Sequence, residues 1–482
     1  MSNFVNMAKR VNDVTVTENG AKAFRSTGGG ALLDLFAVIG GKRNDPSSVV
    51  PMWREARAED KELADNLILY ARNIRDGGIG ERNIGRLLLA ELGKVDPRKV
   101  ARNFDTIVNT GRWDDLLVFL GTPLEVEVID FIKVQLKNDL SNMNANKPIS
   151  LLAKWLPSIN TSSPKTRSQA RKVAHGFGMD QRTYRKTLSA MREYLNVVEK
   201  KMSSREWNEI DFESVPSVAM NRYQNAFANH CDGWDAYRAA LARGEAKVNA
   251  STLFPYDICM KYFTRGISDV DEAAWKALPN FVDEDYNVVV MADVSGSMTM
   301  DSYRPMATSV GLATYFAQRN KGAYHNMYMT FTDNPHFIFI QDGMSLNDIF
   351  RKVQKEGVGY STNLDRAFAE IFRVAKESGE APEALVVISD CEIDSYRYRN
   401  SSDGIVEKWN VEFKKAGFDR CPKVIFWNVE NRHGSYLDKA YQNVSYVSGY
   451  GIGPFKNLST LINNSAYKAM VEILSKPEFS WK

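Results

Sequence analysis

Cysteine and histidine are scarce in this chain, and each scarcity excludes a kind of site. Four cysteines stand far apart among 482 residues, with no Cys-x-x-Cys pair. That spacing argues against a disulfide framework and against a cysteine zinc site. The five histidines are scattered, and none pairs with a nucleophile in the order of a Ser-His-Asp triad. We therefore interpret the cysteines as reduced packing residues and expect no catalytic triad.

Long hydrophobic runs and phosphate-binding loops are also missing. The apolar stretches are only a few residues long, too short to span a bilayer, and the first twenty residues lack the hydrophobic centre of a signal peptide. No Gly-x-x-x-x-Gly-Lys-Ser/Thr motif is present, which argues against a P-loop ATPase. We expect a protein without catalytic activity and without membrane partners, located in the cytoplasm, or in the host cytoplasm if a phage encodes it.

The pattern of apolar residues changes near residue 280. Before it, segments such as ADNLILYARNIRD and EVEVIDFIKVQLKNDL repeat apolar residues at helical spacing. This predicts an all-α domain over residues 1–280, built as a bundle or a solenoid-like stack. After it, strand patterns such as NVVVMADVS, ALVVISD and KVIFWNV alternate with helical ones. This predicts an α/β domain over residues 283–482 with a doubly wound, mostly parallel sheet.

Acids and hydroxyls follow the expected strands of the second domain. The stretch MADVSGSMTM places Asp293, Ser295 and Ser297 directly after one strand, and VISDCEID places Asp390 after another. Thr362 lies in a loop before a helix. Ligand sites of such sheets lie beyond the carboxyl ends of the strands, so we expect these five side chains to converge. An all-oxygen set suits Mg²⁺ or another hard divalent cation better than Zn²⁺.

This combination resembles the metal-ion-dependent adhesion site (MIDAS) of von Willebrand factor A domains. The resemblance implies that Ser295, Ser297 and Thr362 bind the ion directly or nearly so, and that Asp293 and Asp390 hold it directly or through water. An ion with few charged ligands would accept a carboxylate or phosphate from outside. The residues alone leave one alternative open, in which Asp293 caps a helix and the serines form a turn. The nearby acids Glu392 and Asp394 are interpreted as solvated.

Basic residues are concentrated in one stretch of the helical half. Between Lys147 and Arg192 there are ten lysines and arginines against a single acid, Asp180. A field of that sign attracts phosphate or an acidic partner. Trp155, His175, Phe177 and Tyr184 are interleaved with the charges, and aromatic faces could stack unpaired bases, although the spacing around Trp155 favours a core position. The candidate RNA-binding residues are Lys154, Lys165, Arg167, Arg171, Lys172, Arg182, Arg185 and Lys186.

The helical half also resembles a known group. The segments STGGGALLDLFAVIGG, YARNIRDGGIGERNIGRLLL, TGRWDDLLVF and SLLAKWLPS are similar to the helical region of the Ro autoantigen (TROVE) group. They are closer still to an uncharacterised family of phage, bacterial and plant proteins in which a helical domain precedes an A domain. In the Ro group, HEAT-like helices bind small structured RNAs on a basic face and pass single-stranded ends through a ring. The resemblance therefore implies a ribonucleoprotein.

Two functions of different classes follow from these observations. The first is a Ro-type RNA-binding scaffold, with small structured or single-stranded RNA on the basic stretch and a metal site that recruits a carboxylate or phosphate. The second is a metal-dependent protein-interaction or assembly module, for example a phage virion or host-directed component. In the second, a partner protein donates an acidic residue to the metal. Retention of RNA separates the two.

Overall fold

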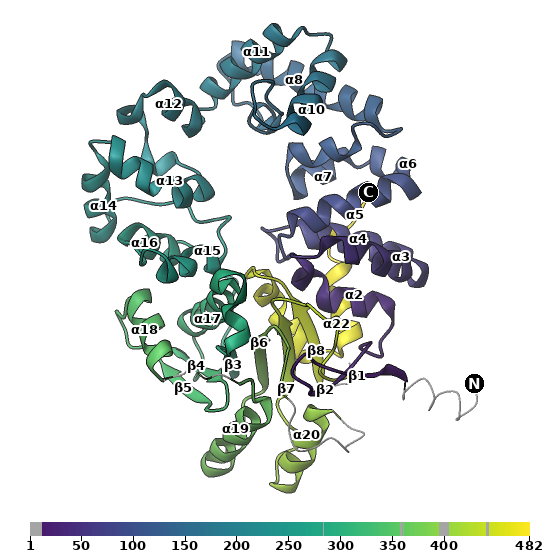
Figure 1. The fold of residues 1–482 in the computed structure, drawn as a ribbon, viewed down its shortest axis with the longest axis vertical. Helices are drawn as coiled ribbons and strands as arrows, with labels where there is room; N and C mark the ends of the chain where they lie inside the picture. The colour runs from purple at the N-terminus through teal and green to yellow at the C-terminus, as the bar shows by residue number, and fades with distance from the viewer. Residues whose placement is uncertain (1–11, 283, 357–358, 360, 395–403, 440–442) are drawn as a thin grey trace. The chain divides into compact units, whose positions relative to one another are not determined.

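The computed structural model describes residues 12–282, 284–356, 359, 361–394, 404–439 and 443–482 (Figure 1). Its contacts divide the chain into two compact units. One, the sheet unit, comprises Met1–Ile84 and Ala250–Phe479, and the other, the helical unit, comprises Gly85–Asn249 and Ser480–Lys482. The change of sequence pattern near residue 280 coincides with the start of the large sheet. The boundary between the two compact units lies elsewhere, because it depends on which residues pack together. It places the N-terminal segment in the same unit as the sheet.

A six-stranded sheet forms the centre of the sheet unit, in the order β5-β4-β3-β6-β7-β8. All neighbouring strands are parallel except β4 and β5, which are antiparallel. The expected doubly wound, mostly parallel arrangement is therefore confirmed. The strands are β3 (Val288–Asp293), β4 (Met327–Phe331), β5 (His336–Phe339), β6 (Ala384–Ser389), β7 (Lys423–Asn428) and β8 (Val444–Ser448).

Burial on both faces explains why the central strands are nearly continuous apolar runs. Every residue of β3, β6, β7 and β8 is buried, as expected for a parallel sheet covered on both sides. On one face, Met291, Val387 and Phe426 pack in a core with Phe368 of α19 and Phe413 of α20. Helix α17 covers the other face, where its Ser309 donates a hydrogen bond to the carbonyl of Ile388.

Helices before and after the strands complete the sheet unit (Figure 1). Those from the N-terminal part of the chain are α2 (Ala31–Val38), α3 (Val49–Glu59), α4 (Lys61–Arg72), α15 (Pro255–Cys259) and α16 (Asp269–Lys276). Those interleaved with the strands are α17 (Met300–Arg319), α18 (Leu346–Glu356), α19 (Leu364–Ser378), α20 (Ile405–Lys415), α21 (Leu458–Asn463) and α22 (Ala466–Leu474).

The first segment of the chain is joined to the sheet. Strands β1 (Val14–Val16) and β2 (Lys22–Phe24) form a small hairpin, and Phe24 exchanges two backbone hydrogen bonds with Tyr436, at 2.8 and 2.9 Å. Helix α2 packs on β8, where the amide of Gly40 donates to Ser448 Oγ at 2.9 Å. These contacts bring residues from the beginning of the sequence to the edge of the sheet where the candidate site lies.

The helical unit consists of helices and short helical turns. Helix α5 (Arg82–Val95) spans the division in the sequence. The others are α6 (Pro97–Ala101), α7 (Phe104–Thr110), α8 (Glu125–Asn144), α9 (Leu152–Trp155), α10 (Pro164–Gly176), α11 (Gln181–Tyr194), α12 (Val198–Ser204), α13 (Ser217–His230) and α14 (Trp234–Arg243). The N-terminal region is helix-rich, as expected, but the prediction that residues 1–280 are all-α is wrong, because residues 14–16 and 22–24 form the strands β1 and β2. No helix in the described ranges combines the length and the apolar character needed to cross a membrane.

Candidate functional site

Asp293 ends the buried strand β3, and the loop after it folds back onto its carboxylate. Asp293 Oδ1 accepts a hydrogen bond from the amide of Ser295 at 2.9 Å. The hydroxyls of Ser295 and Ser297 are 3.2 Å apart. The short helical turn Gly296–Thr299 follows. The sequence therefore forms an acid-and-hydroxyl loop at the carboxyl end of the strand, and Asp293 is not a helix cap.

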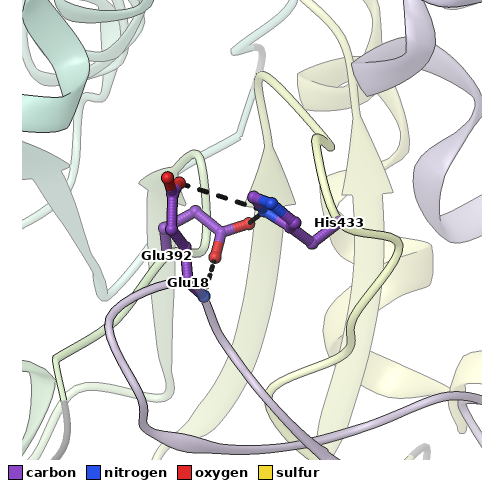
Figure 2. A group of neighbouring side chains, drawn as sticks. All are labelled: Glu18, Glu392 and His433. Carbon is purple, nitrogen blue, oxygen red and sulfur yellow. Dashed lines mark hydrogen bonds and ion pairs between the residues drawn. The ribbon is translucent and has the colours of Figure 1, made fainter.

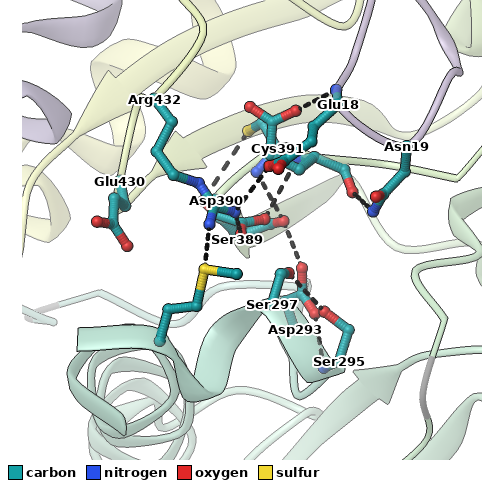
Figure 3. A network of polar contacts seen from close by, with 12 residues as sticks. Glu18, Asn19, Asp293, Ser295, Ser297, Ser389, Asp390, Cys391, Glu430 and Arg432 are labelled. Atoms are coloured by element: carbon teal, nitrogen blue, oxygen red, sulfur yellow. Dashed lines mark hydrogen bonds and ion pairs between the residues drawn. The ribbon is translucent and has the colours of Figure 1, made fainter. Parts of the chain in front are cut away.

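The end of β6 supplies the second half of the cluster, because β3 and β6 are parallel neighbours (Figure 3). Ser389, the last residue of β6, donates a hydrogen bond to Asp293 Oδ2 and accepts one from the amide of Cys391 at 2.9 Å. The Ser297 side chain lies close enough to Asp390 to lower the pKa of its carboxyl. Four of the five expected residues, Asp293, Ser295, Ser297 and Asp390, are therefore brought together, with Ser389 between the two acids.

Burial sets the electrostatics of this pair of acids. Asp293 is fully buried and Asp390 is 1% exposed. Loss of hydration raises the pKa of Asp293, and the neighbouring charge of Asp390 raises it further, against hydrogen bonds from Ser389 and Ser295 that lower it. Loss of hydration also raises the pKa of Asp390, which the cation Arg432 partly counteracts. Two buried carboxylates close together are costly when both are ionised, so the site favours either a bound proton or a cation.

Arg432 is a cation that the sequence did not suggest. Its Nη2 donates to Asp390 Oδ2 at 2.5 Å and lies 3.8 Å from Glu18 Oε2. Arg432 lies in the loop after β7, and the local sequence does not predict the path of that loop. Only the tertiary structure therefore places its guanidinium beside Asp390. Figure 3 shows the guanidinium between Asp390 and Glu430. It neutralises part of the charge that a metal ion would otherwise balance.

Glu392 corrects one expectation, because it is not solvated. It is 2% exposed, and its carboxylate accepts the amide of Glu18 at 2.6 Å and contacts Nδ1 of His433 at 3.0 Å. Asp394 is half-buried and accepts the amide of Thr362 at 2.6 Å. The apolar residues Cys391 and Ile393, which alternate with these acids, are the sequence signal that this segment continues beneath the surface.

Thr362 lies beside the exit of β6, and its backbone makes the contact. Its amide and carbonyl both pair with Asp394, and its side chain is buried. In the part of the chain that the structure describes, no hydrogen bond links the Thr362 hydroxyl to Asp293, Ser295, Ser297 or Asp390. Thr362 is thus near the expected place and separate from the hydrogen-bonded cluster.

The donor set fits a hard divalent ion in part. Neighbouring ligands of an octahedral Mg²⁺ with bonds of about 2.1 Å lie about 3 Å apart, and the hydroxyls of Ser295 and Ser297 are separated by 3.2 Å. Asp293 adds a carboxylate beside them. Asp390 offers a second, but Arg432 already contacts its Oδ2. An ion bound by both acids would therefore share Asp390 with the guanidinium or displace it.

The candidate RNA-binding residues lie on α9, α10 and α11 of the helical unit. Six are exposed: Lys165, Arg171, Lys172, Arg182, Arg185 and Lys186. Lys154 and Arg167 are half-buried, and Arg167 donates to the carbonyl of Thr161 at 2.9 Å. Lys172 is paired with Glu125 at 3.0 Å. Within the described residues, no ion pair engages Lys165, Arg171, Arg185 or Lys186.

Two of the aromatic residues of this stretch, Phe177 and Tyr184, are not available for base stacking. Phe177 and Tyr184 are buried against one another, with ring centroids 6.2 Å apart, and the Tyr184 hydroxyl donates to the carbonyl of Pro157 at 2.9 Å. Trp155 is half-buried, and the guanidinium of Arg112 lies 3.8 Å from its ring centroid. The suggestion that these rings stack unpaired bases is therefore wrong for Phe177 and Tyr184, which fill the core instead.

The chain combines two kinds of region with one candidate site. A helix-rich region precedes a doubly wound α/β region, and acids and hydroxyls gather beyond the carboxyl ends of the two central strands. Two family models, both described as domains of unknown function, match parts of this chain. DUF7788 matches residues 287–464, across the sheet, and DUF2828 matches residues 161–291, which include α10 and α11.

Individual proteins are similar over longer stretches. "Uncharacterized protein L728" of Acanthamoeba polyphaga mimivirus is 27% identical over 510 residues, covering 96% of this chain and 87% of that protein. Among solved structures, the crystal structure of the Deinococcus radiodurans RO (RSR) protein covers 92% of both chains, with 13% identity and a TM-score of 0.37.

Proposed function

We propose that this protein is a non-catalytic RNA-binding scaffold of the Ro type. The observation that carries the proposal is the set of exposed cations on the outward faces of α10 and α11. The segments quoted above that resemble the Ro group support the same reading. The RNA would be small and structured, or single-stranded, and it would be held in a ribonucleoprotein.

Helical spacing gathers the cations of α11 on one side. Arg182, Arg185 and Lys186 stand at positions i, i+3 and i+4, opposite the buried Tyr184 and Leu188. Asp180, which caps the helix through the amide of Thr183, is the acid nearest to Arg182. These cations are therefore directed to solvent with little local neutralisation, as a phosphate-binding surface requires.

The buried aromatic rings restrict the mode of binding. Because Phe177 and Tyr184 are in the core, recognition would rest on phosphate contacts more than on stacked bases. Contacts of this kind are largely independent of sequence and weaken as salt rises. We therefore expect a preference for shape and charge rather than for a base sequence.

Charge reversal on the two helices tests the proposal. In the full-length protein, Arg171, Arg182, Arg185 and Lys186 are changed together to Glu, and the affinity for a labelled single-stranded RNA and an RNA hairpin is measured by anisotropy. We expect the Kd at about 0.1 M salt to rise at least tenfold, because four phosphate contacts become repulsive.

The matched control reverses four exposed lysines of the sheet unit, Lys355, Lys376, Lys414 and Lys468. It changes the net charge by the same amount and should leave the Kd within about threefold of the wild-type value, since the proposal places the phosphate contacts on α10 and α11 and not on these lysines. Equal losses in both variants, or no retention of RNA by the wild type, would contradict the proposal. The second outcome would favour the alternative assembly function, with an acidic protein as partner.

The proposal also includes a Mg²⁺-dependent adhesion site of the von Willebrand A type in the sheet unit. Asp293, Ser295, Ser297 and Asp390 would hold the ion, with Thr362 nearby, and the ion would supply an electrophilic position for a carboxylate or phosphate from outside. What supports it is the convergence of hydroxyl and carboxylate oxygens around two buried acids. Ser297, the half-exposed member, marks the side open to a partner.

Thermal stability tests the ion site. Saturating Mg²⁺ should raise the Tm of the wild type, because a ligand at a hundred times its Kd stabilises the folded state by about 2.7 kcal/mol. The double variant Asp293→Ala with Ser295→Ala should lose this shift, whereas Ser459→Ala, on α21, should keep it. A shift of equal size in the double variant would place the ion elsewhere.

A further inference from the structure

Three ligands of different origin meet beside the Asp293–Asp390 cluster: Glu18 from the β1–β2 turn, Glu392 from the loop after β6, and His433 from the loop after β7 (Figure 2). From this convergence we infer that they form a second divalent-cation site, one that takes a transition ion such as Zn²⁺. This site is separate from the proposed Mg²⁺ site and does not depend on it.

The distances suit a single ion. One ligand atom from each residue lies within 4.8 Å of the other two. His433 Nδ1 is 3.0 Å from Glu392 Oε1 and 3.9 Å from Glu18 Oε2. Ligands of a tetrahedral Zn²⁺ with bonds of about 2 Å are about 3.3 Å apart, so small side-chain rotations bring all three atoms into range.

The backbone holds two of the ligands in place before any ion binds. The amide of Glu18 donates to Glu392 Oε2, and the amide side chain of Asn19 donates to the carbonyl of Glu392 at 2.8 Å. On either side, the Thr17 hydroxyl donates to the carbonyl of Ile393, and Gly20 forms a β-bridge with Asp394. The β1–β2 turn is thus fixed to the loop after β6. Folding has therefore already brought Glu18 and Glu392 together, and binding an ion costs little further conformational entropy for these two ligands.

Charge supplies an independent reason for a cation here. Glu18 and Glu392 bring two carboxylates to this site, and among the described residues the nearby guanidinium of Arg432 donates to Asp390 and lies 3.8 Å from Glu18. The side chain of Glu392 is only 3% exposed. Buried carboxylates require a positive partner, and one guanidinium directed at Asp390 does not balance them.

The imidazole decides which cation fits. Nitrogen and oxygen ligands together suit Zn²⁺ and other transition ions, whereas Mg²⁺ prefers oxygen alone. The ion would take the Nδ1 lone pair of His433 in place of the present contact between Nδ1 and Glu392, and the ring proton would then lie on Nε2. His433 and Glu18 are about half exposed, which gives the ion an entry path and leaves one coordination position for water or an outside ligand.

Binding of Zn²⁺ and of its spectroscopic substitute Co²⁺ tests the inference in the full-length protein after removal of metals by a chelator. Calorimetry should detect one Zn²⁺ per chain, and Co²⁺ should give visible absorption bands. We expect His433→Ala and Glu18→Gln each to weaken Zn²⁺ binding at least tenfold and to remove the Co²⁺ bands. Both changes are at exposed side chains, so folding should be preserved; circular dichroism checks this.

Two controls separate this site from its surroundings. His175→Ala removes an exposed histidine of α10 and should change nothing, and Asp293→Asn disables the proposed Mg²⁺ site but should keep Zn²⁺ binding. Equal Zn²⁺ affinity in wild type and His433→Ala, an equal loss in His175→Ala, or full displacement of Zn²⁺ by millimolar Mg²⁺ would each overturn the inference. If Mg²⁺ fails to raise the Tm of the wild type while Zn²⁺ still binds, the result counts against the proposed Mg²⁺ site and leaves the Zn²⁺ site supported.

Discussion

Buried carboxylates are the main residue-scale feature of the sheet unit, and each accepts hydrogen bonds from one neighbour in the sequence and from one residue distant in the sequence. Asp293 accepts hydrogen bonds from the Ser389 hydroxyl and the Ser295 amide. Asp390 accepts hydrogen bonds from the Arg432 guanidinium and the amide of Glu392. Asp438 is a third case, because it accepts the amides of Val406 and Lys439 at 3.0 and 2.8 Å. Hydrogen bonds of this kind reduce the cost of burying a charge without removing it.

Asp438 gives a prediction about stability and pH. Burial raises its pKa to about 6, against the lowering effect of its two backbone hydrogen bonds. Since the folded state binds this proton more tightly than the unfolded state, the free energy of unfolding should fall as pH rises from about 4 to about 6. The difference between wild type and Asp438→Asn should therefore change by about 3 kcal/mol over that range.

Urea denaturation at pH 4, 5, 6 and 7 measures this difference. Other titrating groups contribute equally to both proteins, so subtraction isolates Asp438. The wild type should lose stability relative to the variant on going from pH 4 to pH 7. A difference that stays constant with pH would show that the carboxyl keeps its ordinary pKa.

At the scale of elements, the start of α17 is strained beside the candidate site. Asp301, Ser302 and Tyr303 all have positive φ, from 48° to 69°, a conformation that costs roughly 1–2 kcal/mol for each residue with a side chain. Tyr303 stacks on Phe263 with ring centroids 4.7 Å apart, and Arg304 pairs with Asp301. These contacts hold the turn that follows the Ser295–Ser297 loop.

Substitutions at Ser302, whose side chain is exposed, test that strain. Ser302→Gly should stabilise the protein by about 0.5–1 kcal/mol, because glycine tolerates positive φ, although its unfolded chain is more flexible. Ser302→Val should destabilise it by at least about 1 kcal/mol, because a β-branched side chain disfavours this backbone. The Tm should be highest for Ser302→Gly, intermediate for the wild type and lowest for Ser302→Val. A higher Tm for Ser302→Val than for Ser302→Gly would contradict a left-handed turn.

At the scale of the whole molecule, charge is distributed locally. The formal net charge is only +3, so attraction to RNA would come from the surface of α10 and α11 and not from the protein as a whole. For the quadruple charge-reversal variant, this adds a quantitative expectation. The slope of log Kd against log salt should become shallower by about 3, at about 0.7 for each lost phosphate contact with a single strand. The control lysines should leave the slope unchanged.

Long-range ties decide which segments form one unit. The β1–β2 hairpin pairs with Tyr436 within the sheet unit, and in the helical unit Asn103 exchanges hydrogen bonds with the backbone of Lys482 at 2.7 and 3.0 Å. The two contacts join residues 412 and 379 positions apart, and no local pattern predicts them. The first contact helps to explain why the hairpin segment belongs to the sheet unit, and the second why Lys482 belongs to the helical unit.

The sequence by itself determined the order of elements and the edge at which the site lies. Apolar periodicity is a local property, so it predicts helices and strands wherever burial is regular, and parallel strands necessarily end at one edge. Asp293, Ser295, Ser297 and Asp390 could therefore be chosen in advance. Ser389 could also have been found, because it ends the strand that precedes Asp390.

Only the tertiary structure decided which other side chains reach that edge. Arg432 and His433 lie in a loop, and Glu18 lies in a hairpin turn that is 374 residues from Glu392 and more than 400 from Arg432 and His433. Loop conformation depends on contacts distant in sequence, which residue spacing does not encode. The same reason separates Tyr184 from Arg185: both stand in one basic stretch, but packing buries the ring and leaves the guanidinium in solvent.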